Sequence, residues 1–303
     1  MLNIKTVQST NQCVIEGILN ELNIEEKTGS DGTQYVMGTA KIRVDTVVDG
    51  EPVENIIPIF MYSKRLKNNG ELNKVYDMIV GYKNNFTSAA VVEDISKASR
   101  VICAGKNCNI VENMWVPNGK NTVTSTFRIA TNFINHSRSE DSNSEDKATF
   151  ELSGVILGIK PELNKNEEET GRIIVDMGVV GYQGRIDVIP LIAEGTKKAH
   201  VESNWEKGDT VTVVGVINMS STVQEWKEEL GFGEPITRQR TISKRELLIM
   251  GGSSCGNEEA LSYDSGDVKV ALAERKKRQE MLIEKASNSS AANKTKSNTD
   301  FGF

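Results

Sequence analysis

Histidine and cysteine, the residues that most often carry chemistry, are scarce in this 303-residue sequence. The two histidines, His136 and His200, lie in polar, loop-like stretches, which disfavours histidine catalysis and histidine-ligated metal sites. The four cysteines are irregularly spaced, which is typical of free thiols in a reducing compartment rather than of a disulfide framework. No Walker phosphate loop, Cys/His metal spacing or catalytic triad is found. We therefore expect no enzymatic activity, no metal and no cofactor.

Long hydrophobic runs and an excess of positive charge are also missing. No apolar run approaches the roughly 20 residues of a membrane helix. The first ten residues, MLNIKTVQST, lack the basic-then-apolar order of a secretory signal, so we expect a cytoplasmic protein with no membrane contact. The 36 Lys and Arg against 42 Asp and Glu give a net charge of −6. Any nucleic-acid site must therefore depend on a local arrangement of cations.

Composition divides the chain, and its length suggests two domains. The stretch at 137–147, SRSEDSNSEDK, has no apolar residue and is typical of a solvated linker. Low-complexity polar sequence begins at residue 287 and is unable to bury a core. The expected units are a first domain at 1–136, a linker at 137–147, a second domain at 148–251, a connector and helix at 252–286, and a disordered tail at 287–303.

Short, alternating, β-branched runs predict strands in both halves. In the first half the predicted strands are 13–22, 35–44, 55–63, 100–106 and 122–131. A segment of helical periodicity at 70–95 falls between the third and fourth strands. In the second half they are 150–159, 172–180, 185–192, 210–218 and 241–250. Three strands, a crossover and two strands is the order of the OB-fold, a five-stranded Greek-key barrel.

Sequence landmarks recur in the two halves in the same order. IEGIL at 15–19 aligns with LSGVI at 152–156, and VICAGKN at 101–107 aligns with VTVVGVI at 211–217. Such repetition favours a tandem duplication. We therefore predict a mainly all-β fold of two tandem OB-fold barrels, the first with a helical insert, followed by a C-terminal helix and a disordered tail.

Alternation along the strands separates an inner face from an outer one. The outer face of the second and third strands, the binding surface of OB-folds, carries aromatic residues beside cations. Aromatic rings stack bases at about 1–3 kcal/mol each, while Lys and Arg follow the phosphates. The alternative is that the aromatics cover the helical insert and the cations keep the sheet soluble. We place on the nucleic-acid interface Tyr35, Lys41, Arg43, Phe60, Tyr62, Lys64, Trp115, Lys120, Arg128, Trp226, Arg238 and Arg240.

Trp115 and Trp226 occupy the polar loop before the last strand of each repeat, which flanks the groove in OB-folds. Capping of the barrel end is the alternative for both. The second repeat is expected either to bind weakly or to serve as a protein-contact module, because Asp176 and Asp187 are expected on its outer face. A later run, ERKKRQE at 274–280, predicts either a solvated helix face or an electrostatic contact to a nucleic-acid backbone or an acidic partner.

The chain ends Asp300-Phe301-Gly302-Phe303, with two aromatics in a polar tail. This end is either an accident of the terminus or a tethered peptide ligand. OB-fold order, a low-complexity tail and a terminal phenylalanine beside an acid resemble the bacterial and phage single-stranded DNA-binding proteins. The resemblance implies that Asp300, Phe301 and Phe303 recruit replication or recombination proteins. The family's common form has one OB-fold per chain and several acids at the tip, so two barrels and a single acid suggest a phage-type variant, in the host cytoplasm.

Two functions follow from these features. The first is a non-catalytic single-stranded DNA-binding protein, with RNA as an alternative ligand, acting in DNA replication or recombination. The second is a structural or assembly module that uses its OB-folds for protein contacts, for instance in a phage particle.

Overall fold

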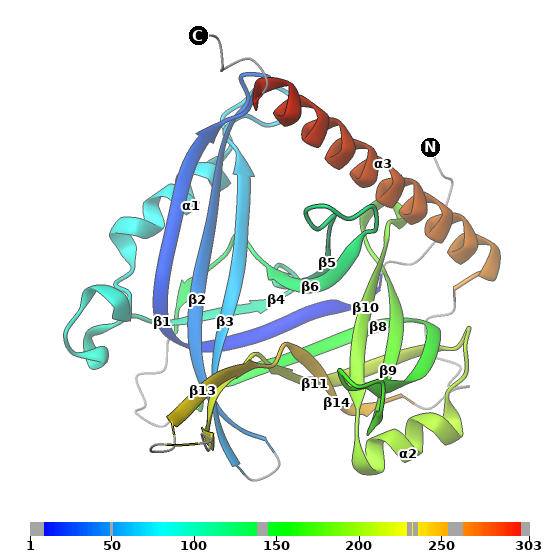
Figure 1. Ribbon diagram of the computed structural model, residues 1–303. Coiled ribbons are helices and arrows are strands. Elements are labelled where there is room, and N and C mark those ends of the chain that lie inside the picture. The colour runs from blue at the N-terminus through cyan, green and yellow to red at the C-terminus, as the bar shows by residue number, and fades with distance from the viewer. Residues whose placement is uncertain are drawn as a thin grey trace.

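The structure is a computed structural model and describes residues 9–48, 51–137, 145–228, 232, 236–253 and 263–297. Two barrels lie side by side, and a long helix, α3 (Ser265–Ser297), runs diagonally above them (Figure 1). Among the described residues, none of the helices has the length and apolar character needed to cross a bilayer.

The first barrel follows the OB-fold order. Its elements are β1 (Asn11–Thr28), β2 (Gln34–Val48), β3 (Glu51–Lys64), α1 (Lys74–Asn85), the 3-10 turns η1 (Ala89–Val91) and η2 (Ile95–Lys97), β4 (Arg100–Gly105), β5 (Asn109–Trp115), β6 (Thr124–Ala130) and the short β7 (Asn135–His136). Strands β1, β2 and β3 form an antiparallel meander, and β3 pairs in parallel with β6. The barrel closes because β6 pairs with β5 and β4 pairs with β1.

The fourth strand of this barrel is broken in two. Gly105 has a φ of 74° and begins a turn that Cys108 closes through its N–H to the Gly105 carbonyl, at 2.9 Å. A left-handed φ suits glycine, which has no Cβ to clash. The single strand predicted at 100–106 is therefore only the first half, and the second half, β5, was missed.

The second barrel repeats the same order. Its elements are β8 (Lys147–Leu163), β9 (Glu169–Val180), η3 (Tyr182–Gly184), β10 (Ile186–Ala193), α2 (Gly195–Asn204), β11 (Thr210–Asn218), β12 (Ser221–Glu228), β13 (Ile236–Ser243) and β14 (Glu246–Gly252). Strand β10 pairs in parallel with β14, and β11 pairs with both β14 and β8. The prediction of two OB-fold barrels in a mainly β chain is thus confirmed.

The predicted last strand at 241–250 is wrong in one respect. Its first three residues belong to β13, which pairs with β12 in a separate two-stranded sheet. Every residue of β12 is exposed, so this hairpin stands apart from the barrel core. The strand that closes the barrel begins only at Glu246.

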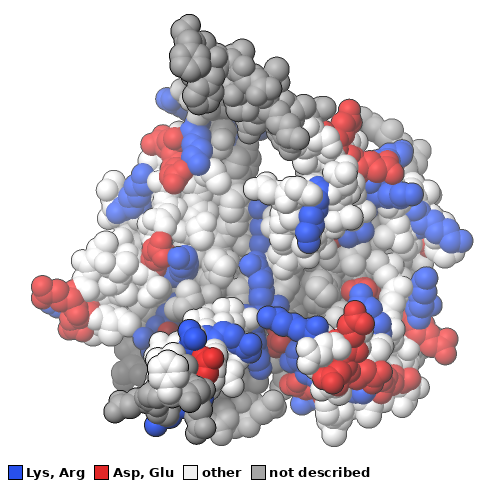
Figure 2. All heavy atoms as spheres, in the orientation of Figure 1, with Lys and Arg blue, Asp and Glu red and all other residues white. Residues whose placement is uncertain are grey.

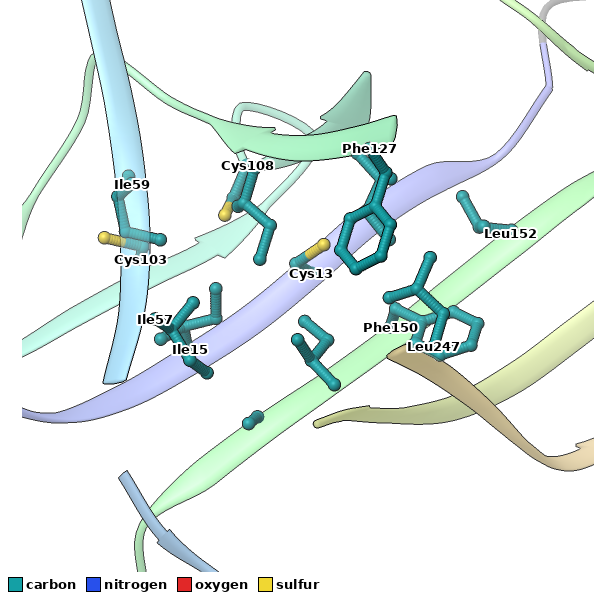
Figure 3. Close-up of a cluster of buried hydrophobic side chains, with 14 of the residues drawn as sticks. Cys13, Ile15, Ile57, Ile59, Cys103, Cys108, Phe127, Phe150, Leu152 and Leu247 are labelled. Carbon is teal, nitrogen blue, oxygen red and sulfur yellow. The ribbon is translucent and has the colours of Figure 1, made fainter. Parts of the chain in front are cut away.

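Strand β1 joins the two barrels. It pairs with β8 over the register Asn11↔Leu152 to Glu16↔Lys147, in addition to pairing with β2 and β4. Figure 3 shows Cys13 of β1 in one buried cluster with Phe150 of β8, and the hydrophobic core is continuous between the barrels. Asn55 of β3 adds a polar link: it is fully buried, and its Oδ1 accepts a hydrogen bond of 2.8 Å from the Met219 N–H.

The ends of the expected segments differ from the prediction. Helix α3 continues to Ser297, so residues 287–297, expected to be disordered, are helical. Near the end of the expected linker, Asp146 is ordered and accepts a bond of 2.6 Å from Arg100. Residues 138–144 and the tip at 300–303, with Asp300, Phe301 and Phe303, lie outside the described residues.

Candidate nucleic-acid interface

The outer face of β2 and β3 carries a row of rings. Cross-strand register places Tyr35 opposite Lys64, Met37 opposite Tyr62 and Thr39 opposite Phe60. The residues between them, such as Val36, Ile59 and Met61, are fully buried, so the predicted division into inner and outer faces is confirmed. The rings of Tyr35 and Tyr62 lie 5.6 Å apart, and Tyr62 is 41% exposed.

The same face continues across β6 and β5. Phe60 pairs with Ala130, and Arg128, two residues earlier on β6, places its guanidinium carbon 4.3 Å from the Phe60 ring centroid. Arg128 pairs in turn with Val111 of β5, and Trp115 follows Val111 on the same side of that strand. Trp115 is 41% exposed. We name the set Tyr35, Phe60, Tyr62, Trp115 and Arg128 the aromatic face.

Part of the aromatic face lines a groove between the two barrels. The groove has a volume of about 1470 Å³, and Phe60, Tyr62 and Arg128 line its first-barrel wall. The turn between β9 and β10 and the first half of α3 form the other wall, with Arg185, Asp187 and Arg278. Figure 2 shows the hollow between the barrels on this side of the molecule, with Lys and Arg side chains along it. Three of the twelve predicted residues are thus gathered in one cavity.

Two predicted phosphate contacts are already neutralised. Lys41 lies opposite Glu21 of β1 and binds its carboxylate at 2.6 Å, and this contact lowers the pKa of Glu21. Arg43 contacts Asp45 at 3.1 Å and Glu54 at 2.9 Å. Neither cation lines the groove. Exposed pairs of this kind contribute only about 0–1 kcal/mol to stability, but each acid opposes a phosphate at that position.

A second surface gathers three more candidates. On the β12–β13 hairpin, Trp226 lies opposite Arg238, and Gln224 lies opposite Arg240, so Trp226 and both arginines share one face. Trp226 is 45% exposed, and Arg238 binds Glu228 at 2.6 Å. The structure thus places eight of the twelve predicted residues on two surfaces, five on the aromatic face and three on this hairpin. Lys64 and Lys120 are exposed but do not line the groove.

The corresponding strand of the second barrel is built differently. Arg172 of β9 contacts Glu162 at 2.7 Å and Glu246 at 2.7 Å, and Glu194 lies at 3.7 Å. Hydrogen bonds from Glu162 and then Glu246 raise the pKa of Arg172 above its already high value. Asp176, also on β9, is paired with Lys160 at 2.7 Å. This strand presents paired charges rather than rings.

Sequence reasoning missed three cations of the groove, Lys106, Arg185 and Arg278. Arg185 lies two residues before Asp187, one of the acids expected to weaken binding by the second repeat. Arg278 belongs to the run at 274–280 and donates to the Ile186 carbonyl at 2.7 Å, a contact within the chain that tests neither a nucleic-acid nor a partner contact of that run. Arg275, in the same run, forms two bonds of 2.9 and 2.5 Å with the buried carboxylate of Glu112.

Comparisons with known proteins give structural likeness and a family. No curated protein matches this sequence. Two solved structures of the single-stranded DNA-binding protein from Thermus aquaticus are similar. The wild type has 11% identity and a TM-score of 0.47, covering 84% of this chain and 97% of its own. A deletion mutant of the same protein has 10% identity and a TM-score of 0.46, covering 82% of this chain and 95% of its own. The sequence model of the YorF family matches residues 9–289, and the chain therefore belongs to the YorF family.

Proposed function

We propose that this protein binds single-stranded DNA without catalysing a reaction, through the aromatic face and the groove beside it. The observation that supports this most strongly is the placement of Tyr62, Phe60 and Arg128 together on one wall of a groove of about 1470 Å³. Rings that stack bases, next to a guanidinium that contacts phosphate, are the means by which OB-folds hold single strands.

Stacking favours a single strand over a duplex. In a duplex both faces of every base are covered by neighbouring bases, so an exposed ring such as Tyr62 or Trp115 finds no free base to stack on. The net charge of −6 also disfavours binding by electrostatics alone. Base stacking is therefore expected to supply much of the affinity, with a modest dependence on salt.

The test is a titration of labelled oligo-dT and of a duplex of equal length, at low and moderate salt. Tyr62→Ala is expected to weaken oligo-dT binding by about 1–3 kcal/mol, the contribution of one base stack. Tyr62→Phe is the matched control, since it keeps the ring, and it should bind as the wild type does. Equal affinity of the wild type for oligo-dT and duplex would overturn the proposed function.

The wider role we propose is in DNA replication or recombination, in a phage-encoded protein whose tip recruits other replication proteins. Phe301 and Phe303 offer rings to a pocket, and Asp300 and the terminal carboxylate suit a basic rim. Deletion of residues 300–303 is expected to leave oligo-dT affinity unchanged and to abolish capture of a replication protein. Capture that survives the deletion would contradict this part of the proposal.

One set of observations favours the second candidate, an OB-fold assembly module. Lys41 and Arg43 are paired with acids, and the β12–β13 hairpin exposes Val223 and Ile236, which suit a protein contact. Such a module would bind neither oligo-dT nor duplex, so the same titration separates the two functions.

A further inference from the structure

Three arginines from three separate parts of the fold meet at one end of the groove. Arg128 comes from β6 of the first barrel, Arg185 from the turn before β10 of the second barrel, and Arg278 from α3. One acid, Asp187, lies among them: it binds Arg185 at 3.0 Å, and the nearest atom of Arg278 lies 3.7 Å away.

The positive charge of this cluster exceeds its negative charge. Of the other acids that line the groove, Glu112 is fully buried and bound in two places by Arg275, so that pair is neutral. Glu151, on β8, accepts a hydrogen bond of 2.9 Å from Gln12 rather than from an arginine of the cluster. Glu274, further along the wall, is paired with Lys277 at 2.6 Å. Asp187 alone therefore faces three guanidinium groups, and the cluster carries an excess of two positive charges.

Two donors in the cluster make no hydrogen bond, although one of them, the Nη1 of Arg278, lies 3.7 Å from the Asp187 carboxylate. The Nε of Arg128 and the Nη1 of Arg278 are buried and make no hydrogen bond with any described residue. A buried charged donor without a partner costs at least as much as a lost hydrogen bond. Burial, and then the charge of Arg185, lower the pKa of both Arg128 and Arg278, as expected for like charges held together out of water.

We propose that Arg128, Arg185 and Arg278 form a phosphate-binding site that takes a backbone phosphate of a single strand at the junction of the two barrels and α3. Guanidinium groups bind phosphate oxygens through paired N–H donors, which suits three guanidinium groups on one groove, with the Nε of Arg128 without a hydrogen bond and the Nη1 of Arg278 held only by Asp187 at 3.7 Å. Arg128 also covers Phe60, so a base on the aromatic face would place its own phosphate at this site. This inference rests on the proposed function and adds that both barrels hold the same strand.

The test compares Arg185→Gln and Arg128→Gln with the control Lys160→Gln. Lys160 resembles Arg185 in barrel, exposure and pairing, since their side chains are 56% and 53% exposed and each binds one Asp. Each arginine variant should weaken oligo-dT binding about tenfold, as expected for a lost charge-assisted hydrogen bond. Each should also flatten the slope of log affinity against log salt by about 0.7. Lys160→Gln should change neither, and thermal unfolding should confirm that all variants are folded.

Nuclear magnetic resonance of the arginine Nε–H groups gives a readout that needs no oligonucleotide. Inorganic phosphate should shift the Arg128 signal and leave that of Arg172, whose Nε is bound to Glu162, in place. Wild-type affinity and slope in both arginine variants would overturn the inference while the proposed function stands. Loss of the preference for single strands would overturn the function, and a phosphate shift would then show a site for free anions rather than for a strand. Displacement of phosphate by an acidic peptide but not by oligo-dT would also contradict the inference.

Discussion

The two barrels share one topology and differ in what their outer faces carry. In the first, β2, β3 and β5 present rings, with Arg128 of β6 held over Phe60 and one of its donors without a hydrogen bond. In the second, β9 presents Arg172 enclosed by Glu162 and Glu246. A guanidinium satisfied by two carboxylates stabilises its own barrel, whereas one held by an aromatic ring remains available to a ligand. The same architecture thus carries a row of outward-facing rings in one copy and a largely buried ion-pair network in the other.

The largest effect should come from the glycines that align between the repeats, Gly105 and Gly215. A Cβ on Gly215 would lie 2.1 Å from the Leu248 carbonyl oxygen, so Gly215→Ala should destabilise the protein by about 3 kcal/mol. A Cβ on Gly105 would meet no atom, so the left-handed φ is the reason for its cost. Gly105→Ala should therefore lower the free energy of unfolding by about 1–2 kcal/mol. Urea unfolding measures both, and equal losses would show that the two positions play one role.

Arg172→Gln should rank next. It leaves Glu162 and Glu246, with side chains 19% and 14% exposed, without their shared partner, and hydrogen bonds to charged groups contribute about 1.5–3 kcal/mol. We expect the free energy of unfolding to fall by about 2 kcal/mol and oligo-dT affinity to stay unchanged. A loss of affinity without a loss of stability would place a binding role in the second barrel.

The two exposed tryptophans test the comparison directly. Trp115→Ala should weaken oligo-dT binding by about 1–3 kcal/mol, because Trp115 belongs to the aromatic face. Trp226→Ala should weaken it less, because the β12–β13 hairpin stands apart from the groove. Fluorescence anisotropy measures both, and the reverse order would make the hairpin the principal binding surface.

The smallest effect should be a change in how stability depends on pH in the acidic range. Hydrogen bonding from Arg172 lowers the pKa of Glu162 below its ordinary 4.5. A carboxyl whose pKa is lowered in the folded state stabilises the protein at pH values above its ordinary pKa. This contribution is lost as the pH falls through the pKa of the folded state. Unfolding followed from pH 7 down to below 4 should therefore show a decline that is shallower in Arg172→Gln. Parallel curves of stability against pH for the wild type and Arg172→Gln would contradict this prediction.

The alternation of apolar and polar residues in the sequence was sufficient to predict the inner and outer faces of β2 and β3, because every second residue of such a strand must enter the core. The pairing of Lys41 with Glu21 was out of reach, because the predicted strand ends would place Leu22 opposite Tyr35, whereas the structure pairs Leu22 with Ala40. The proximity of Arg128, Arg185 and Arg278 could not be predicted from the sequence, because it depends on how the two barrels and α3 pack against one another. The break after Gly105 depends on a local turn that strand periodicity does not show.

Strand β1 is shared, since it pairs with β2 and β4 of one barrel and with β8 of the other. A continuous ladder of this kind fixes the distance between the barrels, in contrast to domains on a flexible tether, whose joint binding depends on tether length. The number of nucleotides covered by one molecule is then a property of the fold. On the proposed function, this binding-site size should stay constant as the salt concentration is varied, because the spacing of the two barrels does not change.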